Sequence, residues 1–158
     1  MPDLFFEDFV VGAALPEAEL IVDAADVAYF ADRFGSGASP PGPETLPPPV
    51  SGFHVAALGM RLLFLAFVHR TASLGAPGVD AVSWPYPVRS GDRLRFTARV
   101  TAARRSASRS EMGLITVAIS LFNQDETCVM TQENAIMVAR RPETGRDGAA
   151  CDAGEAGA

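Results

Sequence analysis

Hydrophobic residues crowd one segment of the chain more densely than any other. Residues 52–68 read GFHVAALGMRLLFLAFV, which is apolar on nearly every side of a helix. Such a helix must be buried, because an exposed one would leave most of its apolar surface in water. The pattern therefore predicts one long, buried central helix over residues 54–69.

Strand-like patterns follow this helix. Leu94, Phe96, Ala98 and Val100 alternate with polar residues, which is typical of a sheet with one buried face. The strands predicted after the helix cover residues 81–88, 94–103, 114–122 and 127–139. One more strand is predicted ahead of it, over residues 20–22. Asn-Gln-Asp-Glu at 123–126 predicts the hairpin turn between the last two strands.

A shorter helix is predicted ahead of the central one. Asp23 is an N-cap residue, an apolar pattern follows it, and Gly35 marks the end of the helix. Residues 35–49 are rich in glycine and proline and predict a surface loop near the candidate site. We expect one domain over residues 1–141 and a disordered tail over 142–158, where periodicity is lost.

These elements predict an α+β domain in which an antiparallel sheet wraps around the long helix. Nothing else in the chain is long enough to bury that helix. A single unit of this kind leaves one sheet edge and one flank uncovered. We therefore expect a homodimer, or a heterodimer with a similar chain.

Charge and composition exclude several classes of protein. The net charge of −6 argues against a nucleic-acid partner, which would need a clustered basic face. The absence of Cys/His clusters disfavours a metal site, and the apolar run is shorter than a membrane span and interrupted by Arg61. We expect no metal, no membrane partner and a cytoplasmic location.

The start of the central helix is the candidate site. The first N–H groups of a helix have no partner within it, and the helix dipole favours negative charge there. Backbone N–H groups of Gly52 and Phe53, next to Ser51, could hold a polarised carbonyl oxygen, although Gly52 could equally be a turn residue. His54 could act as acid or base near neutral pH, or could serve only to orient the helix.

Four segments in colinear order resemble the MaoC-like acyl dehydratases, the single hot-dog branch related to (R)-specific enoyl-CoA hydratases. They are FFEDFVVG at 5–12, AYFADRF at 28–34, SGFHVAAL at 51–58, and PGVD at 77–80 with Trp84 and PVRSGD at 87–92. The resemblance spans residues 4–141. It implies the hot-dog fold, an acyl-CoA or acyl-carrier-protein thioester as substrate, and hydratase or dehydratase chemistry without a cofactor.

One departure from the family pattern bears on the mechanism. Family hydratases carry an Asp and a His in the loop after the first helix, spaced as Asp-x-x-Pro-x-His. Gly35 stands where that Asp would be, and residues 35–51 contain neither Asp nor His. The family's catalytic pair cannot be carried over, which leaves His54 as the candidate acid or base.

Other candidate substrate-binding residues lie around this site. Glu44 is the one acid in the loop and could replace the missing carboxylate, or be solvated. Tyr29 could reach the pocket or belong to the core. Trp84 and Tyr86, two apart on one strand face, could line an acyl tunnel or pack on the sheet.

The sequence leaves three functions open. The first is an enzyme catalysing hydration, dehydration, isomerisation or cyclisation of an acyl thioester in a biosynthetic pathway. The second is a non-catalytic acyl-binding subunit that completes a heterodimer with a partner bearing the Asp/His pair. The third, less favoured, is a thioesterase, because a suitable carboxylate is lacking near the helix start.

Overall fold

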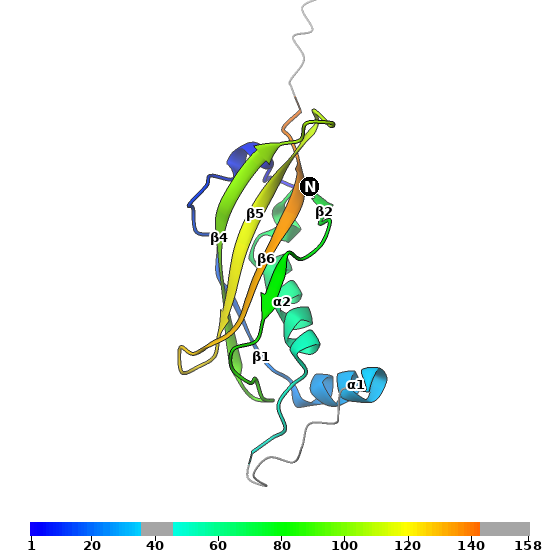
Figure 1. Cartoon of the computed structure of the whole chain (residues 1–158), viewed down its shortest axis with the longest axis vertical. Coiled ribbons are helices and arrows are strands. Elements are labelled where there is room, and N and C mark those ends of the chain that lie inside the picture. Colours follow the sequence, from blue (N-terminus) through cyan, green and yellow to red (C-terminus); the bar gives the residue numbers. More distant parts are fainter. Residues whose placement is uncertain (36–45, 143–158) are drawn as a thin grey trace, which may run out of the picture.

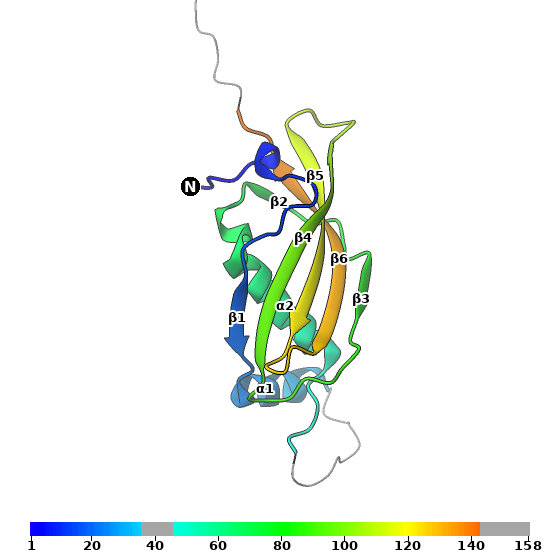
Figure 2. The ribbon, with the colours of Figure 1, turned by 90° about the vertical axis from the view of Figure 1, so that its left-hand side faces the viewer.

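A curled antiparallel sheet of six strands holds one long helix on its inner face, in a computed structural model that describes residues 1–35 and 46–142 (Figure 1). The elements in chain order are η1 (Phe6–Asp8), β1 (Ala18–Ile21), α1 (Ala24–Phe34), α2 (Gly52–Ala66), η2 (Val68–Arg70), β2 (Ser73–Gly75), β3 (Ala81–Ser83), β4 (Arg93–Arg105), β5 (Met112–Phe122) and β6 (Cys128–Ala139). The strand order is β1-β4-β5-β6-β2, and β3 pairs with β6 as well. Figure 2 shows β1 at one edge of the sheet and β3 at the other.

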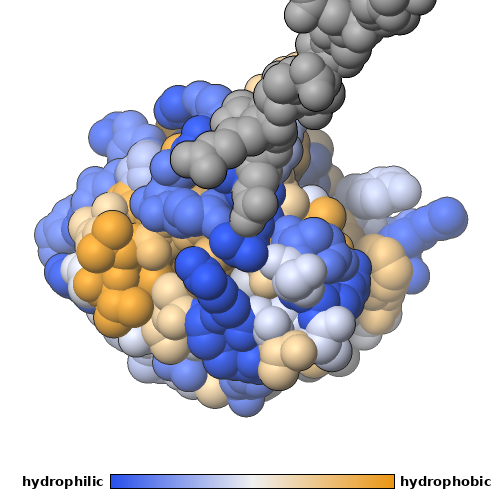
Figure 3. All heavy atoms as spheres, turned by 90° about the horizontal axis from the view of Figure 1, so that it is seen from above, coloured by the Kyte–Doolittle hydropathy of each residue, from blue (hydrophilic) through white to orange (hydrophobic). Residues whose placement is uncertain are grey.

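The three long strands follow their sequence pattern. In β4 the alternating residues Leu94, Phe96, Ala98 and Val100 are buried, as predicted. Hairpins join β4 to β5 and β5 to β6, so neighbouring strands are antiparallel. Figure 3 looks onto the end of the molecule with the β4–β5 hairpin, where mostly hydrophilic surface separates a few hydrophobic patches.

α2 is buried on one side only, which corrects the prediction of a fully buried helix. Val55, Leu58, Leu62 and Ala66 pack into the core beneath the sheet. The opposite side of the helix carries a stripe of apolar residues that are 50–75% exposed: Phe53, Met60, Phe64 and Leu65. The sheet covers only the side of the helix that faces it, so no described residue of this chain buries the stripe.

α1 begins and ends as its sequence predicts. Oδ1 of Asp23 accepts hydrogen bonds from the backbone N–H groups of Ala25 at 2.7 Å and Asp26 at 3.1 Å. Gly35 ends the helix with a φ of 65°, which favours glycine. α1 projects from the end of the sheet, close to the start of α2 (Figure 1).

Two predicted boundaries were wrong. The central helix covers Gly52–Ala66 rather than 54–69, because Phe67 leaves helical geometry with a φ of −153° and a short 3-10 turn follows. The strand predicted over 81–88 ends at Ser83, since Pro85 and Pro87 have no N–H to donate to a neighbouring strand. β2 was not predicted.

Three sequence predictions fall on residues that the structure does not describe. They are the position of Glu44, most of the glycine- and proline-rich loop, and the tail beyond Pro142.

Candidate functional site

The first turn of α2 forms the mouth of the candidate site. The backbone N–H of Val50 donates to the carbonyl of Val88 at 2.7 Å, which ties the entry of the helix to the segment after β3. The first intrahelical bond runs from the N–H of Val55 to the carbonyl of Ser51, at 3.0 Å. The N–H groups of Gly52 and Phe53 therefore precede the helical hydrogen bonds.

Trp84 covers the start of the helix. A Cβ on residue 52 would lie only 2.7 Å from Cδ2 of the indole, so only glycine allows Trp84 to pack this closely. The rings of Trp84 and Phe53 meet edge-on, with centroids 5.6 Å apart. The close approach that requires Gly52 is thus made by an indole ring, and this explains the glycine without a substrate carbonyl.

His54 lies in the first turn of α2 and is 6% exposed. Its imidazole stacks on the ring of Phe30 from α1, with centroids 4.6 Å apart and planes 5° from parallel. Burial lowers the pKa of His54 below its ordinary value, and the negative charge of Asp26 opposes this in part. The imidazole is therefore neutral at pH 7 and can accept a proton. Because Phe30 covers one face of the ring, the ring edge with its two nitrogens is the part available for reaction.

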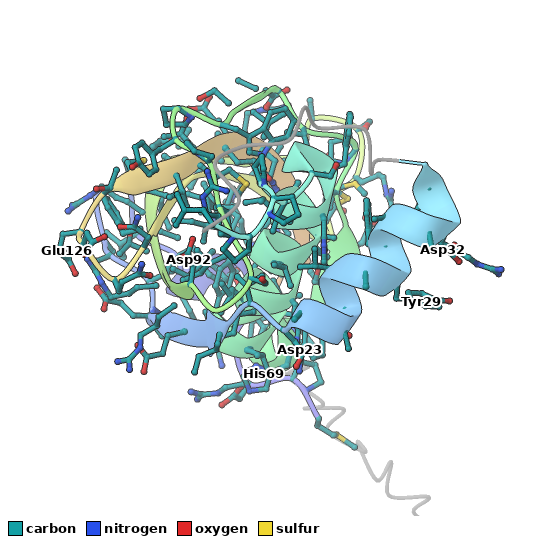
Figure 4. The ribbon with its side chains drawn as sticks, turned by 90° about the horizontal axis from the view of Figure 1, so that it is seen from below. Asp23, Tyr29, Asp32, His69, Asp92 and Glu126 are labelled. Carbon is teal, nitrogen blue, oxygen red and sulfur yellow. The ribbon has the colours of Figure 1, made fainter. Side chains whose placement is uncertain are left out.

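The other candidates are only partly brought to this mouth. Five of the predicted residues lie at the mouth: Ser51, Gly52, Phe53, His54 and Trp84. Tyr29 is 66% exposed, and Figure 4 shows it pointing away from α2 on the outer side of α1. Tyr86 is half exposed and follows the end of β3, so it does not share a strand face with Trp84.

Sequence reasoning missed Phe30, whose ring covers His54. The signal was present, since Phe30 belongs to the apolar spacing of α1 with Val27 and Phe34. It also missed two amides on β6. Gln132 and Asn134 occupy alternate positions between Met130 and Ile136, which are buried on the inner face.

A cavity of about 290 Å³ lies further along α2. α2, η2, β6 and the chain from β2 toward β3 surround it, and its lining residues are Met60, Leu63, Val68, Ser73, Gly75, Ala76, Gly78, Val79, Gln132, Asn134 and Ile136. None of these carries a charge. The cavity is therefore apolar, with an amide pair as its main polar feature.

Two further findings concern residues 1–35 and 46–142. Among them, no three His, Cys, Asp or Glu side chains come together as a metal site would require. None of the helices described is long and apolar enough to cross a membrane.

Several solved structures are similar to this chain. A MaoC-like dehydratase from Rhodospirillum rubrum is 32% identical, with 89% of this chain and 99% of that chain covered and a TM-score of 0.75. An (R)-hydratase from A. caviae involved in PHA biosynthesis is 23% identical, with 86% and 99% covered and a TM-score of 0.63. One chain of the ChsH1-ChsH2 complex from Mycobacterium tuberculosis is 19% identical, with 84% and 98% covered and a TM-score of 0.56.

The comparisons with family models and with curated proteins found no match. The curled antiparallel sheet around α2 is the hot-dog fold, and the predicted α+β class is confirmed. Identity of 32% over nearly the whole of a MaoC-like dehydratase goes beyond a shared fold. The chain belongs to the MaoC-like dehydratases, as its sequence motifs indicated.

Proposed function

We propose that this protein is an enzyme acting on an acyl thioester of coenzyme A or of a carrier protein. The reaction is hydration, dehydration or a related proton transfer such as isomerisation or cyclisation, within a cytoplasmic biosynthetic pathway. One observation carries the proposal: a buried, neutral imidazole lies in the first turn of α2, beside the leading N–H groups of the helix. Membership of the dehydratase family supports the same reaction class.

In this proposal each group has one role. The N–H groups of Gly52 and Phe53 donate to the thioester oxygen, where negative charge develops during the reaction. His54 takes a proton from water as the water oxygen bonds to C3 of the enoyl group, and the C2–C3 double-bond electrons move toward C2 and the thioester. The protonated imidazole then returns the proton to C2, and dehydration follows the reverse path.

We also propose that the active form is a dimer. The exposed stripe of α2, with Phe53, Met60 and Phe64, is an apolar surface that a second chain would bury. All three residues of β3, an edge strand, are exposed too. An open edge next to an apolar helix face suits an interface with a second hot-dog chain, either a copy or a related protein.

A second candidate is a non-catalytic acyl-binding subunit. Residues 35–51 contain neither Asp nor His, so the pair that family hydratases use is missing. One similar structure is a complex of two different chains, ChsH1 and ChsH2. Such an arrangement would allow a partner chain to supply the missing residues.

The deciding experiment incubates the purified protein, alone, with crotonyl-CoA. Loss of the enoyl absorbance and a mass gain of one water would show hydration. His54→Gln should then lower the rate about 10²- to 10⁴-fold, the usual contribution of general acid–base catalysis. His69→Gln is the matched control, because His69 lies in η2, beyond the far end of α2, and its Nδ1 is 2.9 Å from the Phe64 carbonyl oxygen.

Each result has a clear meaning. Full turnover by His54→Gln would refute the catalytic role of His54. Inactivity of the purified protein, with activity restored by a second hot-dog chain bearing the Asp/His loop, would favour the non-catalytic subunit.

A further inference from the structure

Two amide side chains interrupt the apolar inner face of the sheet. In the register of β5 and β6, Gln132 lies opposite Ile119 and Asn134 lies opposite Val117. Both neighbours are buried hydrophobic residues, and Asn134 itself is only 3% exposed. A polar group in such surroundings is costly unless it has hydrogen-bond partners.

The two amides satisfy each other only in part. Nε2 of Gln132 donates to Oδ1 of Asn134 at 3.1 Å. Within the described ranges 1–35 and 46–142 this is the one side-chain hydrogen bond of the pair, and a primary amide can donate twice and accept as well. Every side-chain N or O atom of those ranges that is sealed from solvent has a hydrogen-bond partner. Nδ2 of Asn134 has no partner there, so it keeps some exposure, and Asn134 lines the cavity.

The cavity lies in line with the mouth of the site. Met60 and Leu63, which line it, are seven and ten residues beyond Phe53, or about 10–15 Å along the helix at the usual rise. The chain on the opposite side runs the same course, from Gly78 and Val79 at the cavity to Trp84 on Gly52. α2 and this segment thus both run from the mouth to the cavity.

We propose that the cavity binds the far part of an acyl chain that carries a neutral oxygen, a hydroxyl or a carbonyl, about eight to ten carbons from the thioester. An extended alkyl chain advances about 1.25 Å per carbon, because its C–C bonds of about 1.5 Å zigzag, so eight to ten carbons span about 10–12.5 Å, within the 10–15 Å separation. Free N–H groups of Asn134 and the amide of Gln132 bind the oxygen, while Met60, Leu63 and Ile136 contact the carbons. The inference rests on the proposed function, since it assumes a thioester held at the mouth.

The lining distinguishes this class from its neighbours. A plain alkyl chain would fill the cavity but leave the amide donors without partners, which lowers its affinity. A carboxylate or ammonium group would find no countercharge among the described residues that line the cavity. A neutral oxygen matches both the apolar wall and the amides.

The test compares decanoyl-CoA with 9-hydroxydecanoyl-CoA by calorimetry. The wild type should bind the hydroxylated thioester about three- to tenfold more tightly, the ratio that one or two neutral hydrogen bonds provide. The double variant Gln132→Leu/Asn134→Leu should lose this preference and bind decanoyl-CoA at least as well as the wild type does. Glu133→Gln, on the outer face of the same strand, is the matched control and should keep the preference.

A second arm needs no thioester. Hexan-1-ol added to the wild type should shift the side-chain amide NMR signals of Asn134 and Gln132, and heptane, which has the same number of non-hydrogen atoms, should shift them less. Binding of both thioesters with equal affinity, or a preference kept by the double variant, overturns the inference and leaves the proposed function standing. Failure to bind either thioester, with the hexan-1-ol shifts present, overturns the assignment of a coenzyme A thioester to the mouth and keeps the amide site.

Discussion

α2 presents two different surfaces to the rest of the molecule. On the side of Val55, Leu58 and Leu62 the helix meets a continuous apolar core and contacts β1 and β4. On the side of Met60 and Leu63 it meets a cavity with two amides. The first surface lies wholly in the core, whereas the second combines the buried Leu63 with the exposed Met60 beside an open space.

The largest effect should come from the core side. Leu62→Ala removes a side chain with no exposed surface and should lower the free energy of unfolding by about 2–5 kcal/mol, through lost burial and the cavity it leaves. Denaturant titration measures this. Arg61→Ala, an exposed neighbour on the same helix, should change it by less than about 0.5 kcal/mol. A loss below about 1 kcal/mol for Leu62→Ala would remove the contrast between the two sides.

Gly52→Ala tests the mouth, where the two surfaces meet. The added methyl would lie 2.7 Å from the indole of Trp84, so the ring must move. Overpacking of this kind costs about 1–3 kcal/mol, and the emission of the chain's single tryptophan should shift with it. Gly78→Ala, where a Cβ would meet nothing within 4 Å, should leave the emission unchanged. Unchanged emission in Gly52→Ala as well would contradict the packing.

A smaller effect should appear in the pH dependence of stability. Because burial lowers the pKa of His54, the unfolded chain binds a proton more readily than the folded one. The stabilisation is fully present above the unfolded pKa of about 6.5 and is lost as the pH falls through the lower folded pKa. His54→Gln should flatten the curve at pH values below about 6.5. An unaltered slope in His54→Gln would show that His54 is not the source of the pH dependence of stability.

The smallest effect on stability should come from the cavity side. Gln132→Leu/Asn134→Leu replaces both partners of one hydrogen bond with apolar groups, a change that is nearly neutral or slightly stabilising. We expect thermal unfolding to show a change of less than about 1 kcal/mol in either direction. A large destabilisation would mean that the amides support the core, and the two sides of α2 would then differ less than the structure indicates.

The sequence predicted the parts of the molecule in which pattern and environment agree. Asp23 and Gly35 limit α1 through local backbone chemistry, so the sequence alone was enough to locate them. The alternation in β4 identified its buried face for the same reason. Which residues of α2 form the exposed stripe could not be predicted, because an apolar side chain buried by its own sheet and one left exposed look alike in sequence.

The candidate site was predicted less completely. His54 and Gly52 stood out by residue type and position, but the stacking of Phe30 on His54 depends on how α1 meets α2, a contact between segments that local patterns do not specify. The amides on β6 could have been found from their parity with Met130 and Ile136. The apolar majority of that strand obscured them.

None of the residues of α1 is buried, and this has a consequence for the surroundings of His54. A helix held so lightly should undergo local unfolding at a lower free energy than the whole domain, and its amide protons should exchange with deuterium well before those of β5. Each such opening removes the ring of Phe30 from the imidazole of His54. The opening frequency of one exposed helix would then determine how often that face of the imidazole is uncovered.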